Sequence, residues 1–137
     1  MGLFFQKDFQ LKLTPELFGK LMVLAWAEEH GRSTMPTSQE LTEILLEESG
    51  SLPEEVKGVM HQDPRRIGVS IYEMTDYIAS AQAAGLISRD NPSYLVGTVR
   101  VGAWTAHLML EDYEKKLPNV VSWLRQQIKK SSAKHIA

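Results

Sequence analysis

The sequence contains no cysteine among its 137 residues. A disulfide framework, a thiolate metal site and a thiol nucleophile are therefore excluded, and the chain fits a reducing compartment. Long apolar runs are missing too, because the longest, residues 21–27, is far shorter than the roughly 20 residues that span a bilayer. The N-terminus has no basic start followed by a long apolar stretch, so it does not resemble a signal peptide. We therefore expect a cytoplasmic protein with no membrane partner.

Motifs for catalysis or cofactor binding are also missing. No glycine-rich run leads from a strand into a helix with a lysine behind it, and no serine lies in a nucleophile-elbow pattern. Adjacent glutamates diverge by about 100° on a helix, so we interpret these pairs as solvated: Glu28 and Glu29, Glu47 and Glu48, Glu54 and Glu55. The histidines lack metal-ligand spacing and are interpreted as solvent-facing: His30, His61, His107 and His135. The chain is therefore predicted to be non-enzymatic, with no catalytic residue, no metal site and no cofactor.

Charge is unevenly distributed, although the net charge is only −2. From Glu28 to Glu55 there are eight acidic residues and a single base, Arg32. From Lys115 to the C-terminus there are six bases and no acid. One interpretation is a solvated acidic face and a helix end whose lysines complement the helix dipole. The other is that the basic tail contacts an anionic partner.

The first two helices have clear start signals. Thr14 and Pro15 predict a helix that runs to about His30 and ends at Gly31. Its apolar residues cover most of its circumference, which indicates a buried helix at the centre of the core. A second helix opens at residues 36–40 with a capping box between Thr37 and Glu40, and we expect it to end at residues 49–50. A short helix is expected within residues 51–62.

The third main helix and the segment after it predict a helix followed by a hairpin. Ser70 and Glu73 have the spacing of a second capping box, and Gly85 is expected to end the helix. The buried stripe is predicted from a 3-4-3 spacing: Ile71, Met74, Ile78 and Ala81. Residues 86–89 and 94–101 are expected to be strands joined by a turn at residues 90–93. The predicted core brings together Leu21, Trp26, Leu45, Ile78 and Leu86.

This order of elements resembles the winged helix-turn-helix superfamily. Two segments carry the resemblance: residues 36–45, similar to the family's second helix, and residues 70–89, similar to its recognition helix running into the wing. The resemblance covers about residues 14–101 and implies a mainly α fold with a small β-hairpin, a winged helix-turn-helix with extra C-terminal helices. It divides the chain into a winged-helix domain with an N-terminal arm, residues 1–101, and a C-terminal helical extension, residues 102–137.

The resemblance implies binding of double-stranded DNA, as in a transcription regulator or a replication accessory protein. The phosphate contacts expected from position are Arg65 and Arg66 before the third helix and Arg89 and Arg100 in the wing. The residues expected to lie against the groove are Tyr72, Thr75 and Ser80.

A protein-interaction module is the alternative reading. The outward positions of the third helix carry Glu73 and Asp76 but no base, whereas a DNA-reading helix normally presents Arg, Lys, Asn or Gln. In this alternative, the acidic second and third helices bind a basic protein within a larger assembly.

The C-terminal region has more apolar residues than the winged-helix core needs. They are Trp104, Leu108, Tyr113, Leu117, Val121, Trp123, Leu124 and Ile128. Exposed together, they would exceed the apolar patch that soluble monomers usually tolerate. We therefore predict that these helices form a homodimer; the rival explanation is that they fold back on the first helix of the same chain.

Overall fold

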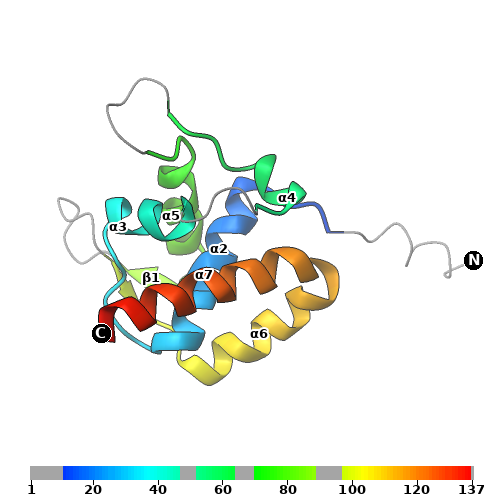
Figure 1. Cartoon of the computed structure of the whole chain (residues 1–137). Coiled ribbons are helices and arrows are strands. Elements are labelled where there is room, and N and C mark those ends of the chain that lie inside the picture. The colour runs from blue at the N-terminus through cyan, green and yellow to red at the C-terminus, as the bar shows by residue number, and fades with distance from the viewer. Residues whose placement is uncertain (1–10, 47–51, 64–69, 89–96, 137) are drawn as a thin grey trace, which may run out of the picture.

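A computed structural model describes residues 11–46, 52–63, 70–88 and 97–136, with side chains described to residue 132. The fold is mainly helical with a small antiparallel sheet, which confirms the predicted class at that level (Figure 1). The elements in chain order are α2 (Pro15–His30), α3 (Ser38–Leu46), α4 (Glu54–Lys57), α5 (Met74–Ala83), β1 (Ile87–Ser88), β2 (Thr98–Val99), α6 (Ala103–Lys116) and α7 (Pro118–Ile136).

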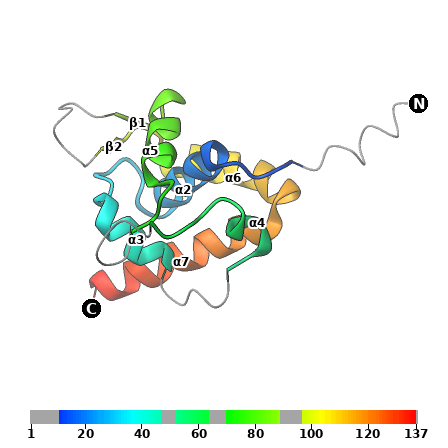
Figure 2. The same cartoon turned by 90° about the horizontal axis from the view of Figure 1, so that it is seen from above.

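Helix α2 forms the centre of the molecule, with the bounds that its sequence predicts. Thr14 accepts a hydrogen bond from the amide of Leu17 at 3.1 Å, Pro15 occupies the first turn, and Gly31 ends the helix with a φ of 69°. Figure 2 shows α5 and α7 on opposite sides of α2, and both helices contact it. Buried on several faces, α2 gives the other helices a common packing surface.

The approach of α5 to α2 depends on a glycine. A Cβ atom at Gly19 would lie 2.2 Å from the carbonyl oxygen of Tyr77, far inside van der Waals contact. The Tyr77 side chain is fully buried, and its hydroxyl donates a hydrogen bond to the carbonyl of Val59 at 2.5 Å. Burial, followed by the charges of Glu73 and Asp76, raises the pKa of Tyr77. The two helices therefore meet backbone to backbone, and Tyr77 ties α5 to the segment after α4.

Helix α3 begins with the predicted capping box. The amide of Thr37 donates to the Glu40 carboxylate and the amide of Glu40 to the Thr37 hydroxyl, both at 3.1 Å. The helix packs on α7, where the buried amide of Gln127 donates to the carbonyl of Ile44 at 2.9 Å. The expected end of this helix at residues 49–50 lies outside the described residues.

The start of α5 differs from its prediction. The expected capping box between Ser70 and Glu73 is wrong, because the helix begins at Met74 and the Glu73 side chain makes no capping bond. Glu73 is buried and accepts a hydrogen bond from the amide of His61 at 2.9 Å, with the His61 ring 2.5 Å from its other oxygen. The Glu73 carboxylate is therefore bonded to His61, in the segment after α4, and does not cap α5. The predicted stripe is buried as expected: Ile71, Met74, Ile78 and Ala81.

The sheet is shorter than predicted, and the segment at Thr34 also pairs with it. Gly85 has a φ of 78°, and β1 pairs with β2 through Ile87 with Val99 and Ser88 with Thr98. The expected turn at residues 90–93 lies outside the described residues. An isolated bridge joins Thr34 to Thr98, so that β2 lies between this segment and β1. The bridge was not predicted, because a single paired residue has no periodicity to detect.

The C-terminal helices fold back on the rest of the chain. Both α6 and α7 contact α2 and each other, and α7 also contacts α3. The buried members of the predicted dimer stripe are Leu117, Val121, Trp123, Leu124 and Ile128. One hydrophobic core contains residues from both sides of the expected domain boundary at 101/102. For α7, the rival fold-back explanation therefore describes the packing.

One predicted core residue is misplaced. Leu21, Leu45, Ile78 and Leu86 are buried, but Trp26 is only partly buried. Its indole N–H donates to the Ser33 hydroxyl at 3.3 Å, and its ring lies 4.0 Å from that of His30, measured between centroids. The indole N–H needs a hydrogen-bond acceptor, and Ser33 provides one at the edge of the core, so Trp26 lies there.

Candidate interaction surfaces

The predicted DNA contacts fall into two groups. Arg65, Arg66 and Arg89 lie outside the described residues, whereas Arg100 is exposed directly after β2. The Arg100 amide donates to the carbonyl of Leu86 at 2.8 Å, which fixes its backbone beside β1. Within the described residues, the segment after β2 therefore presents one arginine from a backbone that is held in place.

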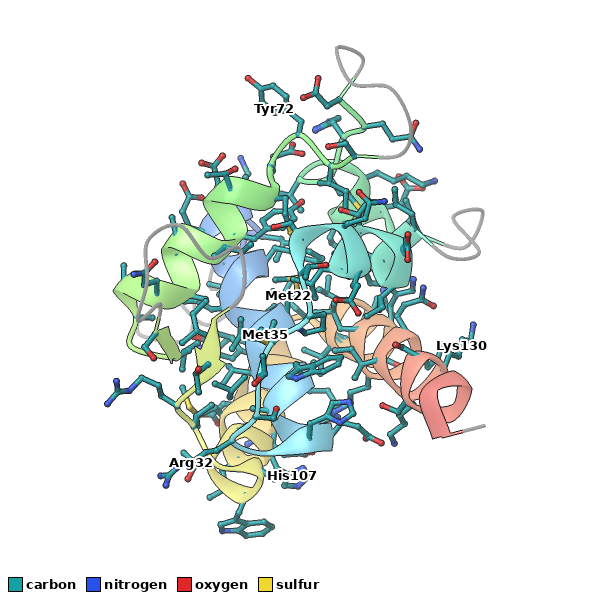
Figure 3. All side chains as sticks on the ribbon, turned by 90° about the vertical axis from the view of Figure 1, so that its left-hand side faces the viewer. Met22, Arg32, Met35, Tyr72, His107 and Lys130 are labelled. Atoms are coloured by element: carbon teal, nitrogen blue, oxygen red, sulfur yellow. The ribbon has the colours of Figure 1, made fainter. Side chains whose placement is uncertain are left out.

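The outer face of α5 is polar and weakly acidic. Tyr72, just before the helix, is 55% exposed and projects from one end of the molecule in Figure 3, and Thr75 is exposed on the first turn. Ser80 is only partly exposed, and its hydroxyl donates to the carbonyl of Glu16 at 2.6 Å, so it also links α5 to α2. The expectation that Glu73 faces outward is wrong, and Asp76 is the exposed acid. Residues 70–83 contain no lysine or arginine.

A network of charged side chains fixes α6 and α7 to α2. Arg125 on α7 donates to both carboxylate oxygens of Glu28 on α2, at 2.9 and 2.8 Å. The same guanidinium donates to Glu114 at 2.8 Å and to Glu111 at 3.1 Å, both on α6. His107, also on α6, lies 2.7 Å from the second oxygen of Glu28. We call these five residues the Arg125 network.

The Arg125 network shifts the pKa of two of its members, Glu28 and Arg125. Burial opposes the charged form of Glu28, but hydrogen bonds from Arg125 and His107 outweigh it and hold the pKa of this carboxyl below its ordinary value. Burial likewise opposes the charge of Arg125, but the contacts with Glu28, Glu111 and Glu114 outweigh it and raise its pKa. Glu28 and Arg125 therefore each favour the charged form of the other in a partly buried position.

The network also corrects two expectations. Glu28 is not a solvated partner of Glu29, because it is partly buried and holds Arg125. The histidines are not simply solvent-facing either, since His61 contacts Glu73 and His107 contacts Glu28. One of the six C-terminal bases, Arg125, is used inside the chain. Pairs such as Glu28 and Arg125, 97 residues apart, have no signal in a single sequence.

The outer face of α6 is the main exposed apolar surface in the described ranges. Trp104 is 70% exposed, Leu108 51% and Met109 38%. The Trp104 ring stacks on that of His107, with 5.5 Å between centroids and 22° between planes. Next to these residues is an open hollow of about 240 Å³, lined by Met109, Asp112, Tyr113 and Lys116. The sequence predicted this apolar excess but not which part of it stays exposed.

Several site types are missing from the described part of the chain. No group of three or more His, Asp or Glu side chains there has a metal-binding arrangement. Among the described helices, none is both long enough and apolar enough for a bilayer crossing. No protein-family model, curated protein or solved structure matches this chain.

Proposed function

We propose that the chain is a non-enzymatic winged-helix protein that binds double-stranded DNA, as a transcription regulator or a replication accessory protein. The observation that carries the proposal is the strand arrangement, with β2 between the Thr34 segment and β1. Combined with the order α2, Thr34, α3, α5, β1 and β2, this supports a winged-helix arrangement, in which α5 would be the recognition helix and the β1–β2 pair the wing. Winged-helix proteins commonly bind double-stranded DNA, and the proposed function rests on that analogy.

The side chains around α5 support a contact with nucleic acid at its N-terminal end. Tyr72 and Thr75 are exposed there, and Arg100 is exposed beside the wing. Because Glu73 is turned into the protein, one of the two carboxylates that would repel phosphates does not face the groove. Affinity in this proposal comes from the arginines that flank α5, at positions 65, 66, 89 and 100, since phosphate contacts supply most of the binding energy.

The test measures binding of the full chain to a random-sequence duplex by fluorescence anisotropy at several salt concentrations. Changing Arg65 and Arg66 to alanine should weaken binding to all duplexes and reduce the slope of log K against log salt by about 1.8. The matched control changes Lys115 and Lys116 to alanine, which removes the same charge from α6 and should leave the slope unchanged. Tyr72→Ala should instead alter the preference among sequences. The absence of salt-dependent binding by the wild-type chain would refute the proposal.

A protein-interaction module is the second candidate, and one observation favours it. The exposed charge on α5 is Asp76, with no base on that helix, and Glu40 and Glu43 are exposed on α3. Such a surface repels phosphates and attracts a basic protein segment. Binding of a lysine-rich peptide that weakens in an Asp76→Asn, Glu43→Gln variant, with no duplex binding by the wild-type chain, would support this candidate instead.

A further inference from the structure

The segment before α3 pairs with β2 in an antiparallel register. The bridge sets Thr34 opposite Thr98, and backbone hydrogen bonds of 2.7 and 2.8 Å hold this pairing on either side. Two residues further along, the same register places Arg32 opposite Arg100. Because successive side chains of a strand point to opposite faces, these four residues share one face of the sheet.

The exposure of the side chains agrees with this register. All four residues are exposed, whereas Val99, which lies between two of them, is buried. Ser88 on β1 is opposite Thr98 and partly exposed, so it extends the same face. The face therefore presents two guanidinium groups and three hydroxyl groups, and its described residues include no carboxylate. We call Arg32, Thr34, Ser88, Thr98 and Arg100 the sheet face.

The two arginines of the sheet face form an unfavourable pair by themselves. Like charges directly opposite each other on neighbouring strands are destabilising. Neither Arg32 nor Arg100 has an ion pair within the described ranges, whereas Arg125 is surrounded by three carboxylates. An anion held between the two guanidinium groups would remove their repulsion.

We propose that Arg32 and Arg100 together bind one phosphate group on the sheet face. Each guanidinium presents a planar set of N–H donors that matches phosphate oxygens. The hydroxyls of Thr34 and Thr98 lie beside the arginines as additional donors. That the phosphate belongs to the backbone of duplex DNA rests on the proposed function, since a free phosphate ion would use the same groups.

The backbones that carry the two arginines are already fixed. The Arg100 amide donates to the carbonyl of Leu86 at 2.8 Å, and Arg32 follows Gly31, whose amide donates to the carbonyl of Ala27 at 2.7 Å. Binding therefore has to order only the side chains, which lowers its entropic cost. In Figure 3, Arg32 lies at the opposite end of the molecule from the exposed tyrosine at the start of α5. Substitutions on the sheet face can therefore be tested without altering that end of α5.

The first test measures duplex binding of the full chain by fluorescence anisotropy at several salt concentrations. Arg32→Ala should weaken binding to all duplexes about 10-fold and lower the slope of log K against log salt by about 0.9, the value for one phosphate. Arg32→Lys keeps the charge but loses the planar donor set, so it should preserve the slope and still lower the affinity. The control, Lys116→Ala, removes an exposed charge from α6 and should change neither quantity.

The two possible failures of this test have different meanings. Absence of salt-dependent duplex binding by the wild-type chain would refute the proposed function and, with it, DNA as the source of the phosphate. Duplex binding by Arg32→Ala with the affinity and slope of wild type would leave the proposed function intact and overturn the DNA contact at the sheet face.

The second test uses inorganic phosphate and does not depend on DNA. Increasing phosphate, compared with chloride at equal ionic strength, should raise the melting temperature of wild type more than that of an Arg32→Ala, Arg100→Ala variant. The variant is the necessary control, because phosphate stabilises folded proteins in general through its exclusion from their surface. An equal rise for both chains at every concentration would overturn the phosphate site itself.

Discussion

Helices α6 and α7 are adjacent and similarly rich in apolar residues, yet they use these residues differently. Helix α7 buries all of its large apolar side chains up to Ile128, because it contacts α2, α3 and α6. Helix α6 buries Ala106 and Leu110 but exposes Trp104, Leu108 and Met109. An apolar stripe therefore shows how much surface a helix can bury, whereas its neighbours decide how much it does bury.

Removing α7 tests whether its buried side chains hold the fold together, and it should reduce stability more than any other change. A chain truncated after Lys116 loses Val120, Val121, Trp123, Leu124 and Ile128 from the core. We expect a loss of several kcal/mol against a total stability of about 5–15 kcal/mol, visible as early and uncooperative thermal unfolding by circular dichroism. A truncated chain with near-native helix content and a sharp transition would show that α7 is dispensable.

A matched pair of substitutions sharpens the comparison. Leu124→Ala on α7 removes a fully buried side chain and should cost about 2–5 kcal/mol in urea unfolding. Leu108→Ala on α6 removes the same atoms from an exposed position and should change stability by less than about 0.5 kcal/mol in the monomer. Equal losses would contradict the difference in burial between the two helices.

The contact of α2 with α5 extends the comparison to a place where backbones meet. Gly19→Ala places a methyl group against the backbone of Tyr77 and should cost about 1–3 kcal/mol through overpacking. Gly58→Ala is the control, since its added Cβ would have an ordinary contact of 3.6 Å and its φ is −79°. Thermal melting of the two variants measures the difference, and a Gly19→Ala chain as stable as wild type would refute the close approach.

The Arg125 network joins the two regions, and adjacent glutamates test it. Glu28→Gln removes the carboxylate that Arg125 and His107 share and should cost about 1–2 kcal/mol, because the site is partly exposed to solvent. Glu29→Gln, at the exposed neighbouring position, should have almost no effect. Equal urea midpoints for the two variants would mean that the network does not stabilise the fold.

Lowering the pH should gradually remove the contribution of Glu28 to the free energy of unfolding. Because the pKa of Glu28 is lower in the folded chain than its ordinary value of about 4.5, the folded state binds fewer protons there than the unfolded state. Its contribution is therefore complete above this value and is lost as the pH falls through the folded-state pKa. The difference in melting temperature between wild type and Glu28→Gln should be constant near neutral pH and narrow below about pH 4.5. A melting-temperature difference that widens below about pH 4.5 would show that folding does not lower the pKa of Glu28.

The sequence predicted the fold class, the burial of α2 and the stripe of α5, and it identified Tyr72, Thr75 and Arg100 as exposed or accessible positions. It did not predict the bridge at Thr34, the inward turn of Glu73 or the contacts of Glu28 with α7. DNA binding is a proposal that the duplex-binding experiment above decides.

By itself, the sequence determined the features that form within about one helical turn. The start of α2 at Thr14 and Pro15, the capping box of Thr37 with Glu40 and the left-handed glycine at residue 85 need only nearby residues, so local stereochemistry decides them. Only the tertiary structure decided the partners of Glu73, Arg125 and α7. The reason is that charged and apolar side chains accept many partners of the same kind, and the packing of segments far apart in the chain selects one of them.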